Sequence, residues 1–306
     1  MKKTLFIVLS FFSFFNLKAQ VQDTNYINLV ERAFKELESN NCESCLRIYE
    51  SAFKISRHSV FSRLRASLCA FECKNDSAFK YHLDFAIKKD MGSSEAILAD
   101  TSYHEFDKYR NTAFFTIANE TIKKEMNAKG YDLALREELR LIEKDDQELR
   151  QKLSNDLTAE QKKELWVKIS YLDSINLLKI EKILDKYGYP GESKVGTRFS
   201  GTAFLVVQHS NLPTMKKYYK IIEEAANKGE FPKSSFALFV DRFRMWSGEK
   251  QLYGSQVKTD KEGQPYFYEI EDEINVNKRR AVMGLGPLEE YAKYFKIEYK
   301  LPTTKN

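Results

Sequence analysis

Apolar residues recur every three or four positions along most of this 306-residue chain, which is the spacing of one face of an α-helix. The pattern is clearest in the second half, where it runs through Leu135, Leu139 and Ile142 and again across residues 165–184. Only six prolines and twelve glycines are available to interrupt it. The sequence therefore predicts a mainly α fold.

Residues 1–20 have the features of a secretory signal peptide. Lys2 and Lys3 form a basic start, residues 5–15 are apolar, and the small residue Ala19 follows. The apolar run is too short to span a bilayer, and no later segment approaches the roughly 20 apolar residues that a spanning helix needs. We expect an exported protein, periplasmic or extracellular, without a membrane span.

The formal net charge of +5 falls to +2 when Lys2, Lys3 and Lys18 leave with the signal peptide. Lysine and glutamate alternate along the predicted helices, which is typical of a solvated surface. No basic patch of the kind that binds nucleic acid is present in the sequence, so we expect no nucleic-acid partner.

About 285 residues remain after the signal peptide, more than a single hydrophobic core usually contains. A glycine at position 130 is placed to end the preceding helix. The sequence therefore predicts two domains, residues 21–128 and residues 131–306.

The first domain reads as short antiparallel helices separated by polar breaks at residues 56–59 and 75–77. Helices of this length with such short connections resemble tetratricopeptide-type helical hairpins. A protein partner that contacts these hairpins is part of the interaction hypothesis given below.

Four cysteines form two pairs whose members lie opposite each other on the two helices of one predicted hairpin. Cys45 and Cys69 lie 12 residues on either side of position 57, and Cys42 and Cys73 lie 15 and 16 residues from it. Spacings of three and four put each pair on one helix face. An oxidising compartment favours two disulfides, Cys45–Cys69 and Cys42–Cys73. A four-thiolate zinc site and unpaired or differently paired thiols remain as alternatives.

The second domain combines long helices with one change of period. Thr158 and Gln161 have the spacing of a capping box that opens a helix. Residues 252–257 and 265–270 alternate with period two around a turn that contains Gly263. We expect an α-helical domain with a small β-hairpin near 252–270.

Polar residues interrupt the apolar pattern of this domain at positions that point inward or lie at helix ends. Polar groups there need hydrogen-bond partners, which indicates one shared polar pocket. These residues are Asp146, Gln147, Arg150, Asp173, Asn176, His209, Asp241, Arg242, Tyr253 and Gln256.

The order of these residues carries a resemblance. Together with Gly188-Tyr189-Pro190, Val206-Val207-Gln208-His209 and Arg280-x-x-x-Gly284-Leu285, it is similar to a family of bacterial proteins built on a domain of unknown function. The resemblance runs from about Leu133 to Tyr299 and leaves the helical first half outside. It implies a fold unit and no particular activity.

His209 is the candidate general acid or base, because an imidazole titrates near neutral pH. In the catalytic hypothesis, Asp241 orients His209 and Arg242 binds an anionic ligand group through two hydrogen bonds. In the structural alternative, His209 bonds to backbone carbonyls at a helix end, and Asp241 and Arg242 form an internal ion pair.

The remaining polar residues form the candidate ligand-binding set. Asp146, Gln147 and Arg150 lie within one helical turn, so they can act together. Asp173 and Asn176 are spaced in the same way.

If Asp146 and Asp173 meet His209, they form either a metal site or an acid/base pair for hydrolysing a glycosidic or amide bond. Tyr253 precedes Gly254 and Gln256. Gln256 either contacts a ligand or satisfies backbone groups beside a bulge at the glycine.

Several catalytic signatures are absent from the sequence. It has no His-x-x-x-His, no Gly-x-Ser-x-Gly and no phosphate-binding glycine loop, so we assign no metal and no cofactor. Two hypotheses remain. The favoured one is an exported interaction or ligand-binding protein with a polar pocket in its second domain. The alternative is an exported hydrolase-like enzyme centred on His209 and Asp241, so the sequence leaves open whether the protein is an enzyme.

Overall fold

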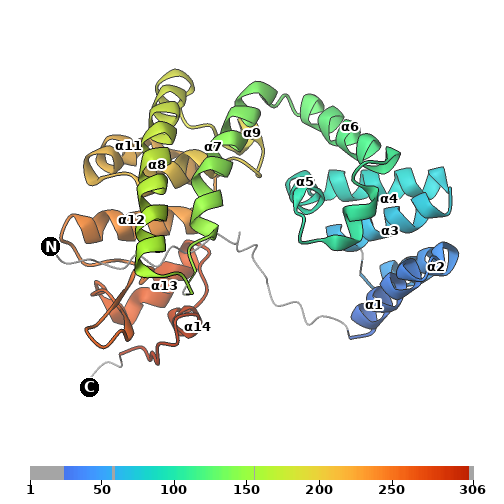
Figure 1. Cartoon of the computed structure of the whole chain (residues 1–306). Helices are drawn as coiled ribbons and strands as arrows, with labels where there is room; N and C mark the ends of the chain where they lie inside the picture. Colours follow the sequence, from blue (N-terminus) through green and yellow to red (C-terminus); the bar gives the residue numbers. More distant parts are fainter. Residues whose placement is uncertain (1–23, 57–58, 155, 303–306) are drawn as a thin grey trace. The chain divides into compact units, whose positions relative to one another are not determined.

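The computed structural model describes residues 24–56, 59–154 and 156–302 (Figure 1). The chain divides into two compact units, one ending at Tyr131 and the other beginning at Asp132. The predicted signal peptide, residues 1–20, and the predicted turn at residues 57–58 lie outside the described residues. The predicted mainly α fold is confirmed.

The N-terminal unit is a succession of packed helices. Helix α1 packs on α2, α2 on α3 and α3 on α4, so the predicted helical hairpins are confirmed. Ser59 and Asn75 cap α3 and α4 by accepting backbone N–H groups, which places the breaks where the sequence predicts them. The likeness to tetratricopeptide repeats and the protein partner stay predictions. The elements are α1 (Thr24–Glu38), α2 (Cys42–Ile55), α3 (Val60–Glu72), α4 (Asp76–Lys89), α5 (Met91–Ala99), the 3-10 helix η1 (His104–Tyr109) and α6 (Ala113–Ala128).

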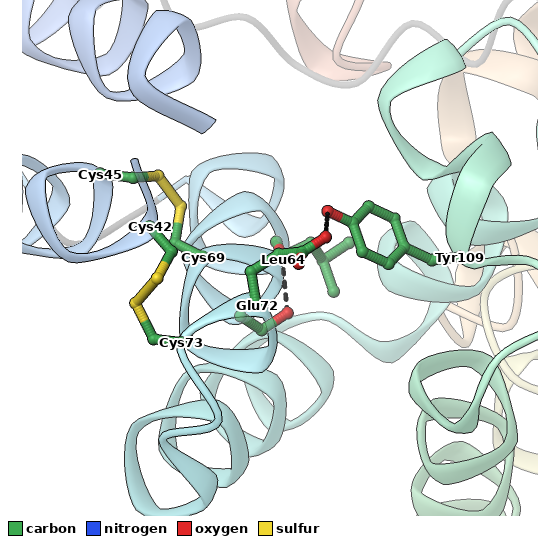
Figure 2. Close-up of a disulfide and its surroundings, with 8 residues drawn as sticks. Cys42, Cys45, Leu64, Cys69, Glu72, Cys73 and Tyr109 are labelled. Carbon is green, nitrogen blue, oxygen red and sulfur yellow. Dashed lines mark hydrogen bonds between the residues drawn. A yellow bond between two sulfur atoms is a disulfide. The ribbon is translucent and has the colours of Figure 1, made fainter. Parts of the chain in front are cut away.

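Two disulfides join α2 to α3, and they are the two that the sequence predicts (Figure 2). The Cα atoms are 5.5 Å apart in Cys42–Cys73 and 6.0 Å apart in Cys45–Cys69. Beside them, the hydroxyl of Tyr109 donates to the Glu72 carboxylate at 2.7 Å. The hairpin is thus closed by covalent bonds as well as by packing.

Buried cations of this unit lie against aromatic rings. The guanidinium of Arg63 is 3.6 Å from the centre of the Phe53 ring and 3.0 Å from Nδ1 of His82. Burial, followed by the Arg63 charge, lowers the pKa of His82 to about 4, so the ring is neutral and Nδ1 accepts. Arg65 lies over two further rings and forms a 2.6 Å ion pair with Glu105.

The C-terminal unit is built around α7, α8 and α10. Helices α7 and α8 lie side by side and α10 contacts both, while α11 packs on α12 (Figure 1). The predicted capping box of Thr158 and Gln161 opens α8. The elements are α7 (Leu133–Gln151), α8 (Ala159–Tyr187), α9 (Glu192–Val195), α10 (Thr202–His209), α11 (Leu212–Asn227), α12 (Lys233–Trp246), β1 (Val257–Thr259), β2 (Pro265–Phe267), the 3-10 helix η2 (Glu273–Asn275), α13 (Val276–Val282) and α14 (Leu288–Lys293).

The core of this unit fixes the relative positions of the site helices. Leu139 and Ile142 of α7, Ile180 of α8 and Phe239 of α12 are fully buried in one apolar cluster, and Phe204 of α10 joins them. Close packing of this kind leaves each helix little freedom to shift. The polar ends of α7 and α10 are held next to the middle of α8.

The β-hairpin is present but shorter than the sequence pattern suggests. Strand β1 pairs antiparallel with β2 over three residues, with Val257 opposite Phe267. Residues 251–256 form a loop instead of a strand, because Asp241 and Gln251 accept backbone N–H groups that a ladder would need. Gly254 in this loop has φ +68°, and a Cβ there would lie 2.9 Å from the Leu288 methyl groups.

None of the helices within residues 24–56, 59–154 and 156–302 combines the length and the apolar character that crossing a membrane requires.

Candidate functional site

Asp146 is the centre of a polar cluster between α7, α8 and α10. Its carboxylate is almost fully buried, with Oδ1 accepting from Nδ1 of His209 at 3.0 Å and Oδ2 accepting from Gln147 at 2.6 Å. Burial raises the pKa of Asp146, but the charge and hydrogen bond of His209, the charge of Arg150 and the hydrogen bond from Gln147 lower it by more. An ionised carboxylate only accepts, so Nδ1 of His209 carries a proton.

Arg150 links Asp146 to Asp173. It lies one turn after Asp146 on α7, and its Nη1 donates to the Asp146 carbonyl at 2.6 Å and lies 3.3 Å from Oδ1. Its Nη2 lies 2.7 and 2.8 Å from the two carboxylate oxygens of Asp173 on α8. Burial raises the pKa of Asp173, and Arg150 offsets only part of that shift. The two carboxylates that share Arg150 therefore have pKa values shifted in opposite directions.

The trio of Asp146, Asp173 and His209 has the composition of a metal site. One potential ligand atom from each lies within 4.8 Å of the others. Arg150 already donates to the Asp173 carboxylate, lies 3.3 Å from the Asp146 carboxylate and supplies a positive charge beside both. A metal ion would have to displace this guanidinium, so the geometry fits a salt-bridged acid/base cluster better than a metal centre.

A pocket of about 510 Å³ borders the cluster. Asp173 and His209 line it, so Asp146 and Arg150 form a second layer that holds the two lining residues. No hydrogen bond joins Nε2 of His209 to any described residue, which leaves that nitrogen for a ligand. The lining residues are Ser170, Asp173, Ser174 and Leu177 of α8, Val206 and His209 of α10, Ser210 and Asn211, Leu212 of α11, and Trp246 of α12.

Asn176, one turn after Asp173, is fully buried. Its Nδ2 donates to the Ile142 carbonyl at 3.4 Å, and its Oδ1 has no hydrogen-bond partner among the described residues.

Gln208 and Arg242 meet next to His209. Nη1 of Arg242 donates to the Gln208 carbonyl at 3.2 Å. Within the described ranges, Oε1 of Gln208 and Nε of Arg242 are both enclosed without a hydrogen-bond partner. Buried polar atoms are rarely left in this state unless water or a ligand completes them.

Asp241 has a different role from the one that the catalytic hypothesis gives it. Its buried carboxylate accepts backbone N–H groups from Leu252 at 2.7 Å, Tyr253 at 3.0 Å and Ser255 at 2.9 Å. Burial raises its pKa, and these bonds offset part of that shift. The carboxylate that orients His209 is thus Asp146, and Asp241 holds the 251–256 loop.

The predicted ion pair of Asp241 with Arg242 is also not the arrangement observed. Successive residues on a helix point about 100° apart, so the two side chains diverge. Arg242 points to α10, whereas Asp241 points to the loop.

Tyr253 and Gln256 belong to the same loop and do not line the pocket. The Tyr253 carbonyl accepts from Nη1 of Arg280 at 2.6 Å. The backbone N–H of Gln256 donates to Gln251 at 2.9 Å, and its side chain donates to Ser255 at 3.0 Å. The structural alternative gives the Gln256 side chain backbone partners, but here the side chain that donates to backbone carbonyls is that of Gln251.

Several pocket residues were not predicted from the sequence. Ser170 and Ser174 share one face of α8 with Asp173 and Leu177, and this helical spacing, which is visible in the sequence, could have predicted that they lie together. Trp246 lies one turn after Arg242 on α12. The sequence also did not show that Gln251 and Arg280 hold the loop, because their contacts with Tyr268 and Tyr253 join residues 17 and 27 positions apart.

Comparison with known proteins places the C-terminal unit in a family. No curated protein and no solved structure matches this chain. A family model described as "Family of unknown function (DUF6624)" matches residues 133–303, which include every candidate site residue from Asp146 to Gln256. The resemblance noted in the sequence is confirmed. Because the match covers more than half of the chain, the protein belongs to DUF6624, a family of unknown function.

Proposed function

We propose that the C-terminal unit binds a small polar ligand in the pocket lined by His209, Asp173 and Trp246. One observation carries the proposal: buried Asp146 holds Nδ1 of His209 and leaves Nε2 without a partner among the described residues, beside the pocket. A carboxylate on one ring nitrogen fixes the tautomer and the orientation of the other. The pocket volume of about 510 Å³ lies within the roughly 300–1,000 Å³ typical of small-molecule sites.

The lining supports a ligand rich in hydrogen-bond donors. The hydroxyls of Ser170, Ser174 and Ser210 each donate to a backbone carbonyl, at 2.8, 2.9 and 2.6 Å, and so turn acceptor lone pairs outward. Nε2 of His209 and the carboxylate of Asp173 are further acceptors. Trp246 adds an apolar wall of the kind on which sugar rings and cations pack. Polyols, sugars and amines are the ligand classes that fit.

The test is a ligand-observed NMR screen of neutral sugars, polyols and amines against the full-length chain. His209→Asn is the decisive variant, because its amide nitrogen replaces Nδ1 as donor to Asp146 while Nε2 is removed. His104→Asn is the matched control, since His104 is exposed and pairs only with Asp107 in the described chain. We expect compounds whose signal disappears with His209→Asn and persists with His104→Asn. A library without any such compound contradicts the proposal.

The Asp146–His209 pair also favours a second candidate, acid/base catalysis by an exported hydrolase-like enzyme. Asp146 takes the orienting role that the sequence hypothesis assigned to Asp241, and His209 acts as general base toward a water in the pocket. Asp173, whose pKa is raised by burial, is suited to return a proton. No described serine is hydrogen-bonded to His209, so water is the nucleophile that the arrangement supports.

p-Nitrophenyl glycosides and acyl p-nitroanilides are suitable probes of this activity. If wild type turns one over, Asp146→Asn should lower the rate by about 10²–10⁴-fold, because the asparagine no longer stabilises the imidazolium. Equal rates for wild type and Asp146→Asn contradict catalysis at this site.

We also infer that the protein functions outside the cytoplasm, in the periplasm or beyond the cell. The two disulfides between α2 and α3 support this location, because such bonds persist in oxidising compartments. Cell fractionation and N-terminal sequencing test it. A mature chain that begins near residue 20 in the exported fraction is expected, and an unprocessed cytoplasmic chain with alkylatable cysteines contradicts it.

A further inference from the structure

Arg242 uses only one edge of its guanidinium group. Its Nη1 donates to the Gln208 carbonyl at 3.2 Å. Its Nε is enclosed and has no acceptor within the described part of the chain. Nη2 makes no hydrogen bond to a described residue either, but it is not enclosed, and the side chain as a whole is partly exposed.

Nε and Nη2 form the edge of the guanidinium that carries two parallel N–H groups. This edge binds both oxygens of a carboxylate or phosphate group at once. The same protein contains an example, because Nε and Nη2 of Arg140 donate to the two oxygens of Glu137 at 2.8 and 2.7 Å. In Arg242 no described side chain is hydrogen-bonded to this edge.

The charge of Arg242 also lacks a counterion. No carboxylate lies within ion-pair distance of its guanidinium in the described ranges, and the nearby charged group is Arg150, which has the same sign. Burial, followed by the Arg150 charge, lowers the pKa of Arg242 to about 10, so it remains cationic at neutral pH. Removing a cation from water without a counterion is unfavourable, which is why such groups are usually paired.

Capping of α10 accounts for only part of this arrangement. The Gln208 carbonyl lies in the last turn of α10, where a cation is favoured. That contact needs a single N–H, which lysine or glutamine would also supply. It does not require an enclosed Nε with a second nitrogen open on the same edge.

We propose that Arg242 anchors an oxyanion site, in which Nε and Nη2 bind the carboxylate or phosphate group of a small molecule. The oxyanion reaches Nη2 from the solvent side, and a shift of the Arg242 side chain that uncovers the enclosed Nε lets its second oxygen accept from Nε. Arg242 is not among the residues that line the pocket beside His209, so the site goes beyond the ligand pocket proposed above and does not depend on it.

Thermal unfolding of the full-length chain in sodium phosphate, sodium acetate or sodium chloride at equal ionic strength tests the site. At concentrations well above Kd, we expect phosphate or acetate to raise the melting temperature by about 2–4 °C over chloride. Arg242→Gln should abolish this rise. Arg140→Gln, which removes an equal charge from an exposed pair, should keep it. The anion with the larger effect identifies the oxyanion class.

A second readout separates a binding role from a capping role. Without added anion, Arg242→Gln should melt at or above the wild-type temperature, because the variant removes a buried cation that has no counterion. A lower melting temperature together with an unchanged phosphate response makes Arg242 a helix cap and overturns the proposal. A wild-type chain that responds equally to all three salts also overturns it.

NMR provides a test that does not require Arg242→Gln to fold. The Nε–H resonance of Arg242, identified by its loss in Arg242→Lys, should move when phosphate is added to wild type. A resonance that stays in place overturns the proposal. His209→Asn should keep the phosphate response, so failure of the oxyanion site and failure of the ligand pocket can be told apart.

Discussion

The two units bury their charged groups in different ways. In the N-terminal unit, Arg63 and Arg65 lie over aromatic rings and two disulfides close the hairpin next to them. In the C-terminal unit, Arg136 and Arg280 also lie near aromatic rings, but Arg150 is held between two carboxylates, and one edge of Arg242 has no hydrogen-bond partner among the described residues. A ring contacts a cation through its π face and satisfies no N–H group along the guanidinium edge, whereas carboxylates and carbonyls accept those N–H groups directly.

We relate this difference to the roles of the two units: buried charge stabilises the fold in the N-terminal unit, and in the C-terminal unit it is also part of the proposed binding sites. Within the described residues of the C-terminal unit, the enclosed side-chain atoms without hydrogen-bond partners belong to Asn176, Gln208 and Arg242. Asn176 follows Asp173 by one helical turn, Gln208 precedes His209, and Arg242 donates to the Gln208 carbonyl. Tyr49 of the N-terminal unit also has such an atom, whereas Arg63 lies against the Phe53 ring. None of the three C-terminal residues lines the pocket itself, so their unsatisfied atoms lie behind its wall.

The largest expected effect concerns Arg150. Arg150→Gln leaves Asp146 and Asp173 without the cation between them, and we expect it to destabilise the C-terminal unit by about 3–5 kcal/mol. Urea unfolding measures the change. Arg140→Gln, which breaks an exposed pair, should cost no more than about 1 kcal/mol. Equal effects of the two variants would show that the buried cluster does not hold this unit together.

The next effect concerns the disulfides. Replacing Cys45 and Cys69 by alanine should destabilise the N-terminal unit by about 2–4 kcal/mol, because the unfolded chain loses a cross-link. Hydrogen exchange measured by mass spectrometry locates the effect in the full chain. Peptides from α2 and α3 should lose protection while peptides from α7 and α8 keep theirs. Loss of protection in both sets would contradict the independence of the two units.

A pH effect of intermediate size is expected for Asp146. Its pKa is lower in the folded protein than in the unfolded chain, so its stabilising contribution is complete above about pH 4 and is lost as the pH falls through the lowered value. The difference in unfolding free energy between wild type and Asp146→Asn should therefore be largest at pH 5 and shrink toward pH 2.5. A difference that grows on acidification would mean that the carboxylate is not held ionised by His209 and Arg150.

The smallest effect tests the unsatisfied atoms on α10. Gln208→Met removes a buried amide whose Oε1 has no partner among the described residues, so stability should stay unchanged or rise by up to about 1 kcal/mol. Thr202→Val on the same helix removes a buried hydroxyl that donates to Glu143 at 3.0 Å, and it should cost about 1–2 kcal/mol. Thermal unfolding distinguishes the two, and a clear loss in Gln208→Met would show that its amide is satisfied within the fold.

Local features of the sequence determined much of this protein. Helical periodicity predicts most of the helices, the spacing of Thr158 and Gln161 predicts the capping box, and the level positions of the cysteines predict both disulfides. These features depend on residues within one helix or one hairpin, where the geometry of the backbone fixes which side chains meet.

Only the tertiary structure decided which carboxylate serves His209. Asp146 and Asp241 are both acidic residues on helices far from His209 in sequence, and no local spacing distinguishes them. Packing of α7 against α10 brings Asp146 to Nδ1, while the face of α12 that carries Asp241 turns toward the 251–256 loop. The pocket walls from α8, α10 and α12 arise in the same way, because contacts between distant segments depend on how whole helices fit together in the core.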